Sequence, residues 1–242
     1  PIDSEHYSIW NLLGKYSNDE IDEIIITASG GPFLNLSLKK FKKITIKDAI
    51  KHPNWKMGRK ISVDSATLMN KVFEFIEALR IFNIDKNKIK ILVHPKSYVH
   101  AIVKFHNGLI KILLHDTNMT IPIFNSIYNC EPKKIISNKI NYDILNNLNL
   151  SKIDIKKFPS IKLLKKIPET HSLFETVLVS ANDELVKLFL EKIISFNQII
   201  PNLEKIMNNK NFIKYKKKSP KTLNEIHKLD YTVRLKTRSL SV

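Results

Sequence analysis

The sequence predicts an α+β fold with three parts: a sheet-containing domain over residues 1–128, a connecting arm over 129–160 and a helical domain over 161–242. Short isoleucine- and valine-rich runs, typical of buried strands, precede residue 115. An Asn107-Gly108 pair between two of these runs is typical of a β-hairpin. Beyond residue 160, apolar residues recur instead with the period of a helix. We therefore expect a sheet with flanking helices, followed by an α-helical domain.

The first half of the chain alternates predicted strands with one long helix. Glu23–Ala28 is typical of a buried strand and ends at the breaker cluster Ser29–Pro32. The following residues, to about 60, are mixed in character and predict a flexible flap over about 29–60. The other elements expected here are a helix from Ser62 to about Phe82, strands at Lys90–Val93, Tyr98–Phe105 and Leu109–Leu114, a type I′ turn at Asn107-Gly108, and a short helix at Thr120–Tyr128.

The second half begins with weak periodicity and several asparagines over 129–160, which predicts the connecting arm. A final helix is expected after Ser219-Pro220, because serine is a favoured N-cap and proline suits the first helical position. The helices expected before it are Ser160–Ile167, His171–Ala181, Glu184–Ser195 and Ile199–Asn208.

Composition excludes several classes of protein. The 242 residues include one cysteine, Cys130, which rules out an intramolecular disulfide framework and suits a reducing compartment. The five glycines form neither G-x-G-x-x-G nor a P-loop, so the chain contains no standard dinucleotide cradle. No apolar stretch is long enough for a membrane span. Because the chain starts at Pro1 without an initiator methionine, we expect it to be a fragment with residues upstream.

The formal net charge of +17 raises the alternative of a basic nucleic-acid-binding module. The basic residues are, however, spread through every segment, and nearly all of them are lysines. Arginine is the more typical bidentate reader of bases and phosphates. We therefore expect no nucleic-acid partner, although an anionic substrate would be attracted by such a field.

The predicted helix from Ser62 to Glu77 has a reactive face. At about 100° per residue, Asn70, Glu74 and Glu77 share one side, with Lys71 nearby. The opposite arc is apolar and consists of Leu68, Val72, Phe75, Ile76 and Leu79. Asp64 is expected as the N-cap, which would leave free backbone donors for an anion. The alternative is an ordinary amphipathic helix.

Asp3 and Glu5 form a second group of reactive side chains. In an extended segment they would project from the same face, with Ser4 on the other. Two adjacent carboxylates repel unless a cation lies between them, and oxygen-only ligands suit Mg²⁺ or Mn²⁺. Taken alone, the pair is better explained by a solvated strand end. Glu74 as a third carboxylate strengthens the case for a metal site.

Two loops complete the candidates. Ser29–Phe33 offers a hydroxyl and approachable backbone amides to a phosphate, unless it is a plain turn after a strand. His52–Gly58 places Trp55 and Met57 on a loop, where exposed apolar groups often close over a ligand. Simple anchoring of the loop is the alternative.

Taken together, these segments resemble the 1-deoxy-D-xylulose 5-phosphate reductoisomerase family. The resemblance covers nearly the whole chain, in the family's order and spacing. It extends to His94-Pro95, Ser97, His100, Met119 and Pro122. The segments that carry it are Asp3-Ser4-Glu5-His6, Ser29–Phe33, His52–Lys60, Ser62–Thr67 and Met69-Asn70-Lys71. The family's N-terminal NADPH-binding domain has no counterpart in this sequence.

The resemblance implies a role for each matching residue. It assigns metal binding to Asp3, Glu5 and Glu74, which with Lys71 are the expected catalytic residues. The substrate contacts that it implies are Ser4, Ser29, His52, Ser65, Asn70 and Lys71, of which Ser29, Ser65, Asn70 and Lys71 match the phosphate pocket. Trp55 and Met57 match the flap. Val72 and Ala28 depart from the family pattern, where glycine is usual.

The implied activity is an NADPH-dependent oxidoreductase reaction in non-mevalonate isoprenoid biosynthesis. With Mg²⁺ or Mn²⁺, 1-deoxy-D-xylulose 5-phosphate would be rearranged and then reduced to 2-C-methyl-D-erythritol 4-phosphate. This chain would hold metal and substrate and be inactive alone. The resemblance also implies a homodimer in the bacterial cytoplasm or a plastid-type organelle, without a membrane partner. A non-redox, metal-dependent sugar-phosphate isomerase is a further alternative.

Overall fold

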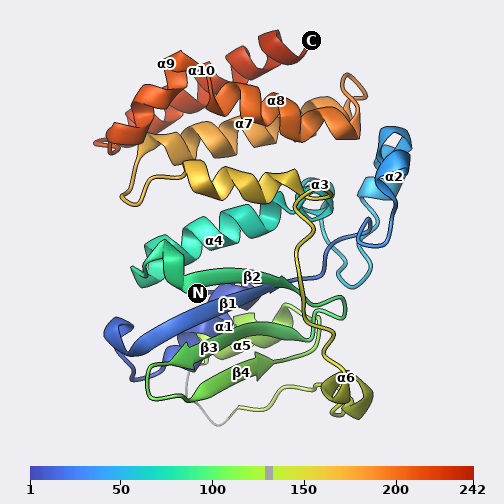
Figure 1. Ribbon diagram of the computed structural model, residues 1–242, viewed down its shortest axis with the longest axis vertical. Coiled ribbons are helices and arrows are strands. Elements are labelled where there is room, and N and C mark those ends of the chain that lie inside the picture. The colour runs from blue at the N-terminus through green and yellow to red at the C-terminus, as the bar shows by residue number, and fades with distance from the viewer. Residues whose placement is uncertain (129–132) are drawn as a thin grey trace. The chain divides into compact units, whose positions relative to one another are not determined.

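The computed structural model describes residues 1–128 and 133–242 (Figure 1). Cys130 and the start of the predicted arm, within 129–132, lie outside the described residues. The described chain divides into two compact units that interleave along the sequence. The first contains Pro1–Gly31, Pro53–Lys56 and Phe73–Asp154, and the second Pro32–His52, Met57–Val72 and Ile155–Val242. The predicted division into consecutive domains stays a prediction.

The predicted α+β class is confirmed by the elements of the structure. The strands are β1 (Ile21–Ala28), β2 (Ile89–Val93), β3 (Val99–Phe105), β4 (Ile110–Leu114) and β5 (Ser151–Lys152). The α-helices are α1 (Ser4–Leu13), α2 (Ile46–Ala49), α3 (Arg59–Thr67), α4 (Met69–Phe82), α5 (Thr120–Ile127), α6 (Tyr142–Asn146), α7 (Leu173–Leu190), α8 (Ile199–Met207), α9 (Lys210–Ile213) and α10 (Leu223–Ser241).

The first unit is built on a mixed five-stranded sheet in the order β4-β3-β1-β2-β5. β1 is central: it runs parallel to β2, with Ile24 opposite Ile89, and antiparallel to β3, with Ile24 opposite Val103. Its second half, from Ile24 to Ala28, is mostly apolar and largely buried, which suits the centre of a sheet. Helix α1 packs against β3 and β4. The sheet therefore provides a rigid support for the start of the chain.

The hairpin between β3 and β4 is present, but the predicted type I′ turn is wrong. The Gly108 amide donates to the Phe105 carbonyl at 2.9 Å, and the Phe105 amide donates to the Leu109 carbonyl at 2.9 Å. Gly108 has a φ of 86°, whereas Asn107 does not lie in the left-handed region. The loop therefore has three residues, a type I turn followed by a glycine bulge. The Asn107 side chain accepts from the Leu109 amide instead.

The predicted single helix from Ser62 is also wrong, because two helices, α3 and α4, meet at Leu68. Leu68 adopts a left-handed conformation with a φ of 58° and ends α3. The Thr67 hydroxyl accepts a hydrogen bond from the Met69 amide at 3.4 Å, at the start of α4. Asp64 is not an N-cap: α3 starts at Arg59, so Asp64 lies inside it, 1% exposed. The predicted apolar arc is buried, including the family-atypical Val72.

In the second unit, α7 is the central helix and packs against α3, α8 and α10 (Figure 1). Its buried face includes Phe174, Leu178 and Leu185, which are fully buried. Two separate helices were expected here, but α7 runs without a break through Asn182, which is fully buried and hydrogen-bonded to Asp64. This tertiary contact explains why a turn-forming residue is accommodated inside a helix.

Two further helix boundaries differ from the predictions. Residues Pro159–Lys166 form a 3₁₀ helix rather than an α-helix. The last helix begins at Leu223, because Thr222 rather than Ser219 is the N-cap and accepts from the Glu225 amide. Within the described residues, no helix is both long and apolar enough to cross a membrane.

The end of α7 allows a test of backbone conformation. Lys192 lies just after the helix with a φ of 62°, and the Ile193 amide closes a Schellman motif on the Leu188 carbonyl at 2.9 Å. Glycine is the usual residue at this position. We expect Lys192→Gly to raise the free energy of unfolding in urea by about 1 kcal/mol, since a left-handed non-glycine residue is strained. Lys187→Gly, inside the same helix, should lower it by about 1 kcal/mol. A loss of stability in both variants would contradict this account.

Candidate functional site

Three carboxylates come together in the first unit. Asp3, Glu5 and Glu74 each offer an oxygen, and these oxygens all lie within 4.8 Å of one another. Glu5 and Glu74 are buried, whereas Asp3 is partly exposed. The structure thus brings together residues that are about 70 positions apart in the sequence, as the sequence predicted.

The start of α1 fixes the first two carboxylates. Asp3 is the N-cap of α1, and its Oδ1 accepts from the amides of Glu5 at 3.0 Å and His6 at 3.2 Å. The predicted extended segment is therefore wrong: Glu5 lies in the first turn of a helix, where a negative charge is favoured. The Ser4 hydroxyl donates to Glu5 Oε2 at 2.5 Å. Capping thus gives the chain end a defined geometry.

His6 ties α1 to α4, a role that the sequence analysis missed. Its Nε2–H donates to the Glu74 carbonyl oxygen at 2.9 Å, which places the proton on Nε2. Its Nδ1 lies 3.3 Å from Asp3 Oδ1 and 3.6 Å from Glu77 Oε2. The imidazole is 2% exposed. The D-x-x-H spacing around the helix start was a usable signal, since residues i and i+3 share a helix face.

The donor set of this cluster suits a hard divalent cation. Burying carboxylates near one another is unfavourable unless a positive charge compensates them. Oxygen-only ligands are the set that Mg²⁺ and Mn²⁺ prefer, and these ions keep several water molecules alongside a few carboxylates. The residues present therefore fit such an ion, with Asp3, Glu5 and Glu74 as its ligands.

The candidate substrate-binding and flap residues are distributed over both units. Ser4, Ser29 and Trp55 belong to the first, whereas His52, Met57, Ser65, Asn70 and Lys71 belong to the second. Ser29 follows β1, and its hydroxyl accepts from the Gly31 amide at 3.1 Å, as in the plain-turn alternative. Ser65 lies in α3, and Asn70 and Lys71 lie in the first turn of α4.

Within the second unit, the charge of Lys71 influences the pKa of His52. Burial, and secondarily the positive charge of Lys71, lower the pKa of His52 from 6.5 to about 4. His52 is therefore neutral at pH 7 and can form hydrogen bonds without adding charge. Lys71 is 7% exposed. An ammonium group beside a neutral imidazole is a suitable pair for a phosphate.

Within the first unit, Asn54 and Trp55 of the predicted flap contact residues around β3. The Asn54 amide donates to the Pro95 carbonyl at 2.7 Å and lies 2.9 Å from the Ser97 hydroxyl. The Trp55 ring lies edge-on to His100, with ring centroids 6.1 Å apart. The anchoring alternative is thus supported for these two residues. The motion of the flap over 29–60 stays a prediction.

A stacked histidine pair lies beneath Trp55. The rings of His100 and His115 are 3.6 Å apart and nearly parallel, at 15°. Burial is the main cause that lowers the pKa of His115, which favours the neutral form needed for such stacking. The stacking therefore indicates a structural role for His115.

Comparisons with protein families and curated proteins identify similar sequences. Residues 1–82 match the "1-deoxy-D-xylulose 5-phosphate reductoisomerase C-terminal domain", and residues 114–236 match the "DXP reductoisomerase C-terminal domain". The chain is 59% identical over 242 residues to the 1-deoxy-D-xylulose 5-phosphate reductoisomerase of Pelagibacter ubique, covering 100% of this chain and 62% of that protein. It is 41% identical over 226 residues to that of Persephonella marina, covering 93% of this chain and 59% of that protein. The chain thus spans about three fifths of the length of these relatives.

Solved structures of similar fold come from the same family. A DOX-P reductoisomerase in complex with NADPH, fosmidomycin and magnesium matches with a TM-score of 0.88 and 30% identity, covering 100% of this chain and 62% of that one. The 1-deoxy-D-xylulose 5-phosphate reductoisomerase of Zymomonas mobilis, in complex with NADPH, matches with a TM-score of 0.86 and 31% identity, covering 100% and 61%. The similarity therefore extends over the whole described fold.

The lowered pKa of His52 predicts a pH dependence of stability. Between pH 6.5 and about 4 the unfolded chain binds a proton on this imidazole that the folded chain does not. The free energy of unfolding should therefore fall as the pH falls through this window. His52→Asn should reduce the slope of the free energy of unfolding against pH by the equivalent of up to about one bound proton. Urea unfolding at a series of pH values measures this slope.

A second measurement separates the two causes of this shift. Lys71→Met removes the neighbouring charge, so NMR titration should show the His52 pKa rising part of the way towards 6.5. An unchanged slope in His52→Asn, together with an unchanged imidazole titration in Lys71→Met, would contradict the proposed electrostatics.

Proposed function

The chain belongs to the 1-deoxy-D-xylulose 5-phosphate reductoisomerase family, and we propose that it forms the metal- and substrate-binding part of such an enzyme. The reaction would be the NADPH- and metal-dependent conversion of 1-deoxy-D-xylulose 5-phosphate to 2-C-methyl-D-erythritol 4-phosphate. The observation that carries the proposal is the convergence of Asp3, Glu5 and Glu74 within 4.8 Å. In this proposal, NADPH would be bound by residues outside this chain.

In this proposal the three carboxylates hold Mg²⁺ or Mn²⁺. When bound, such a cation acts as a Lewis acid and template for adjacent oxygens of the ketose. Ser4, Asn70 and Lys71 would hold the oxygen-bearing backbone of the substrate. Lys71 would add a positive charge. Because this residue is only 7% exposed, solvent would screen that charge weakly. Fixed contacts of this kind orient the substrate before the carbon skeleton rearranges.

The phosphate contacts would come from Ser29, Ser65, Asn70 and Lys71, with His52 close by. A neutral His52 suits hydrogen bonding to a phosphate oxygen, while Lys71 compensates the charge. Trp55 and Met57 would cover the bound substrate and exclude water. Contacts to the phosphate, far from the reacting carbons, supply binding energy for orientation.

Two predicted alternatives gain no support from the family assignment. The nucleic-acid-binding module is based on the net charge of +17, which is carried mostly by scattered lysines. The non-redox sugar-phosphate isomerase would share the metal cluster, but the matching family is a reductoisomerase. A bacterial cytoplasmic or plastid-type location stays a prediction.

The function is tested in the full-length protein with a matched pair of variants. Wild type should oxidise NADPH when given 1-deoxy-D-xylulose 5-phosphate and Mg²⁺, and calorimetry should show metal-dependent binding of fosmidomycin. Glu74→Gln should weaken Mn²⁺ binding by more than about 100-fold, beyond the loss typical of outer-shell partners of a metal. Glu77→Gln, which removes an exposed carboxylate one turn along α4, is the control and should retain binding. Wild type without metal-dependent fosmidomycin binding would overturn the proposal.

We also propose that the full-length protein is a homodimer that pairs through β4. This strand is an edge of the sheet, and it exposes Ile110 by 56% and Ile112 by 42%. An exposed apolar edge strand favours pairing with another copy of itself. Ile112→Lys should shift the protein towards monomer in sedimentation experiments. Ile155→Lys, at another exposed isoleucine, should not. A wild-type monomer at micromolar concentration would contradict this proposal.

A further inference from the structure

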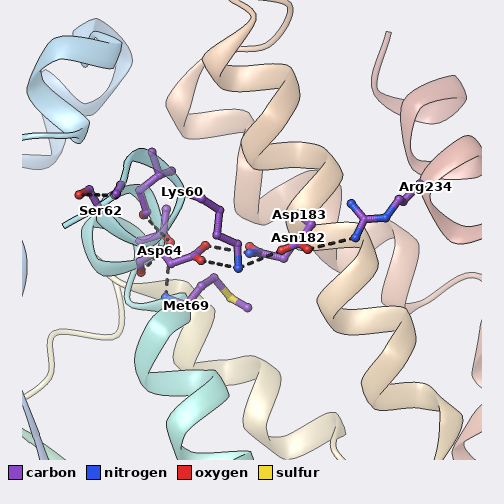
Figure 2. A network of polar contacts seen from close by, with 10 residues as sticks. Lys60, Ser62, Asp64, Met69, Asn182, Asp183 and Arg234 are labelled. Carbon is purple, nitrogen blue, oxygen red and sulfur yellow. Dashed lines mark hydrogen bonds and ion pairs between the residues drawn. The ribbon is translucent and has the colours of Figure 1, made fainter. Parts of the chain in front are cut away.

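A buried carboxylate precedes the proposed phosphate ligand Ser65. Asp64 lies in α3 and is 1% exposed. Its Oδ2 forms an ion pair with Lys60 Nζ at 2.9 Å, and its Oδ1 accepts from Asn182 Nδ2 at 2.8 Å (Figure 2). Burial raises the pKa of Asp64, and these two partners oppose that rise. Both oxygens therefore have defined partners, one on α3 and one on α7.

The contacts continue from Asp64 to the last helix of the chain. Lys60 Nζ also lies 2.9 Å from Asp183 Oδ1, so one ammonium bridges carboxylates of α3 and α7. Arg234 of α10 donates to the other oxygen of Asp183 at 3.1 Å (Figure 2). Arg234 is held in turn by Asp230, at 2.8 Å. The network thus fixes α3 against two C-terminal helices, within one compact unit.

The network lies next to the junction of α3 and α4. Leu68 is the single residue between the two helices. The Thr67 carbonyl accepts from the Ser160 hydroxyl at 2.6 Å, which holds the end of α3 from a third segment of the same unit. Because the connection is one residue long, the orientation of the first turn of α4 follows that of α3. This turn carries Asn70 and Lys71.

The network is difficult to explain by stability alone. A buried ion pair costs desolvation, and well-packed apolar residues of similar size are often as stable. Asn182 Oδ1 is also buried without a hydrogen-bond partner among the described residues, which adds to this cost. What such a buried polar network provides instead is a defined orientation of the elements that it connects. Asn182, fully buried, has no access to bulk water, so it can satisfy Asp64 only in a limited range of positions.

We propose that Asp64, Asn182 and Lys60 are positioning residues that fix the α3–α4 junction, so that Ser65, Asn70 and Lys71 keep the geometry for the substrate phosphate. Helix α7 thereby contributes to anion binding without contacting the anion. This inference rests on the proposed function of Ser65, Asn70 and Lys71.

The test uses the full-length protein and inorganic phosphate as the probe. Asn182→Leu keeps the approximate volume and removes the hydrogen bond to Asp64. We expect the KM for 1-deoxy-D-xylulose 5-phosphate and the inhibition constant of inorganic phosphate each to rise about tenfold, with a smaller change in kcat, because displaced positioning groups lose orientation. Affinity for Mn²⁺ should stay unchanged, since its proposed ligands are Asp3, Glu5 and Glu74.

A control variant separates positioning from stability. Arg238→Gln breaks the contacts of Arg238 to Glu184 at 2.7 Å and Glu191 at 3.2 Å, which also join α7 to α10 but do not reach α3. This control should keep wild-type KM.

A second variant changes a half-exposed side chain. Lys60 is 47% exposed, so Lys60→Met removes the bridge without leaving a buried cavity, and it should raise the same two constants in the same direction. Urea unfolding of this variant measures the stability lost through the unpaired Asp64 carboxylate, so a folded protein can be verified before the constants are compared. Wild-type KM and phosphate inhibition in both Lys60→Met and Asn182→Leu would overturn the inference. A tenfold loss in Arg238→Gln would also overturn it. If wild type itself shows no metal-dependent fosmidomycin binding, the proposed function fails instead.

Discussion

The mutual repulsion of three clustered carboxylates is the constraint on which the first unit depends. Each of them is held by a contact that the local structure supplies. Asp3 caps α1, Glu5 lies where the helix dipole favours a negative charge, and the carbonyl of Glu74 is bound by His6. These contacts hold the backbone of the three residues in positions from which their carboxylates converge. The result is a preformed set of oxygen ligands whose electrostatic cost a divalent cation would remove.

The break at Leu68 has a comparable importance for the second unit. A leucine in the left-handed region costs about 1–2 kcal/mol, and burial of its side chain offsets this by about 1.5–3 kcal/mol. On one continuous helix, Ser65 and Asn70 would lie about 140° apart, from five steps of about 100°. Two helices joined at one residue remove that restriction. The proposed phosphate ligands thus depend on a strained residue that packing stabilises.

The sequence predicted much of this fold because its strands and amphipathic helices have clear periodicity. The strand β1, the hairpin and the apolar arc of α4 were all found where expected. Several of the errors occurred where tertiary contacts decide. The left-handed Leu68 has no local signal, since leucine favours helices. Asn182 was predicted to lie between two helices, because its hydrogen-bond partner Asp64 is 118 residues away in the sequence. Likewise, the convergence of Glu74 with Asp3 and Glu5 was inferred through family resemblance, because spacing alone does not place helices in contact.

The pair of His52 and Lys71 shows how charge is distributed among groups proposed to bind an anion. A phosphate requires positive charge, but two adjacent cations raise the cost of ionising each other. Burial lowers the pKa of His52 to about 4 and so keeps this imidazole neutral beside Lys71 at pH 7. The imidazole then adds a directional hydrogen bond, and the ammonium adds the Coulombic attraction. The two contributions are coupled, because the positive charge of Lys71 is itself one cause of the lowered pKa of His52.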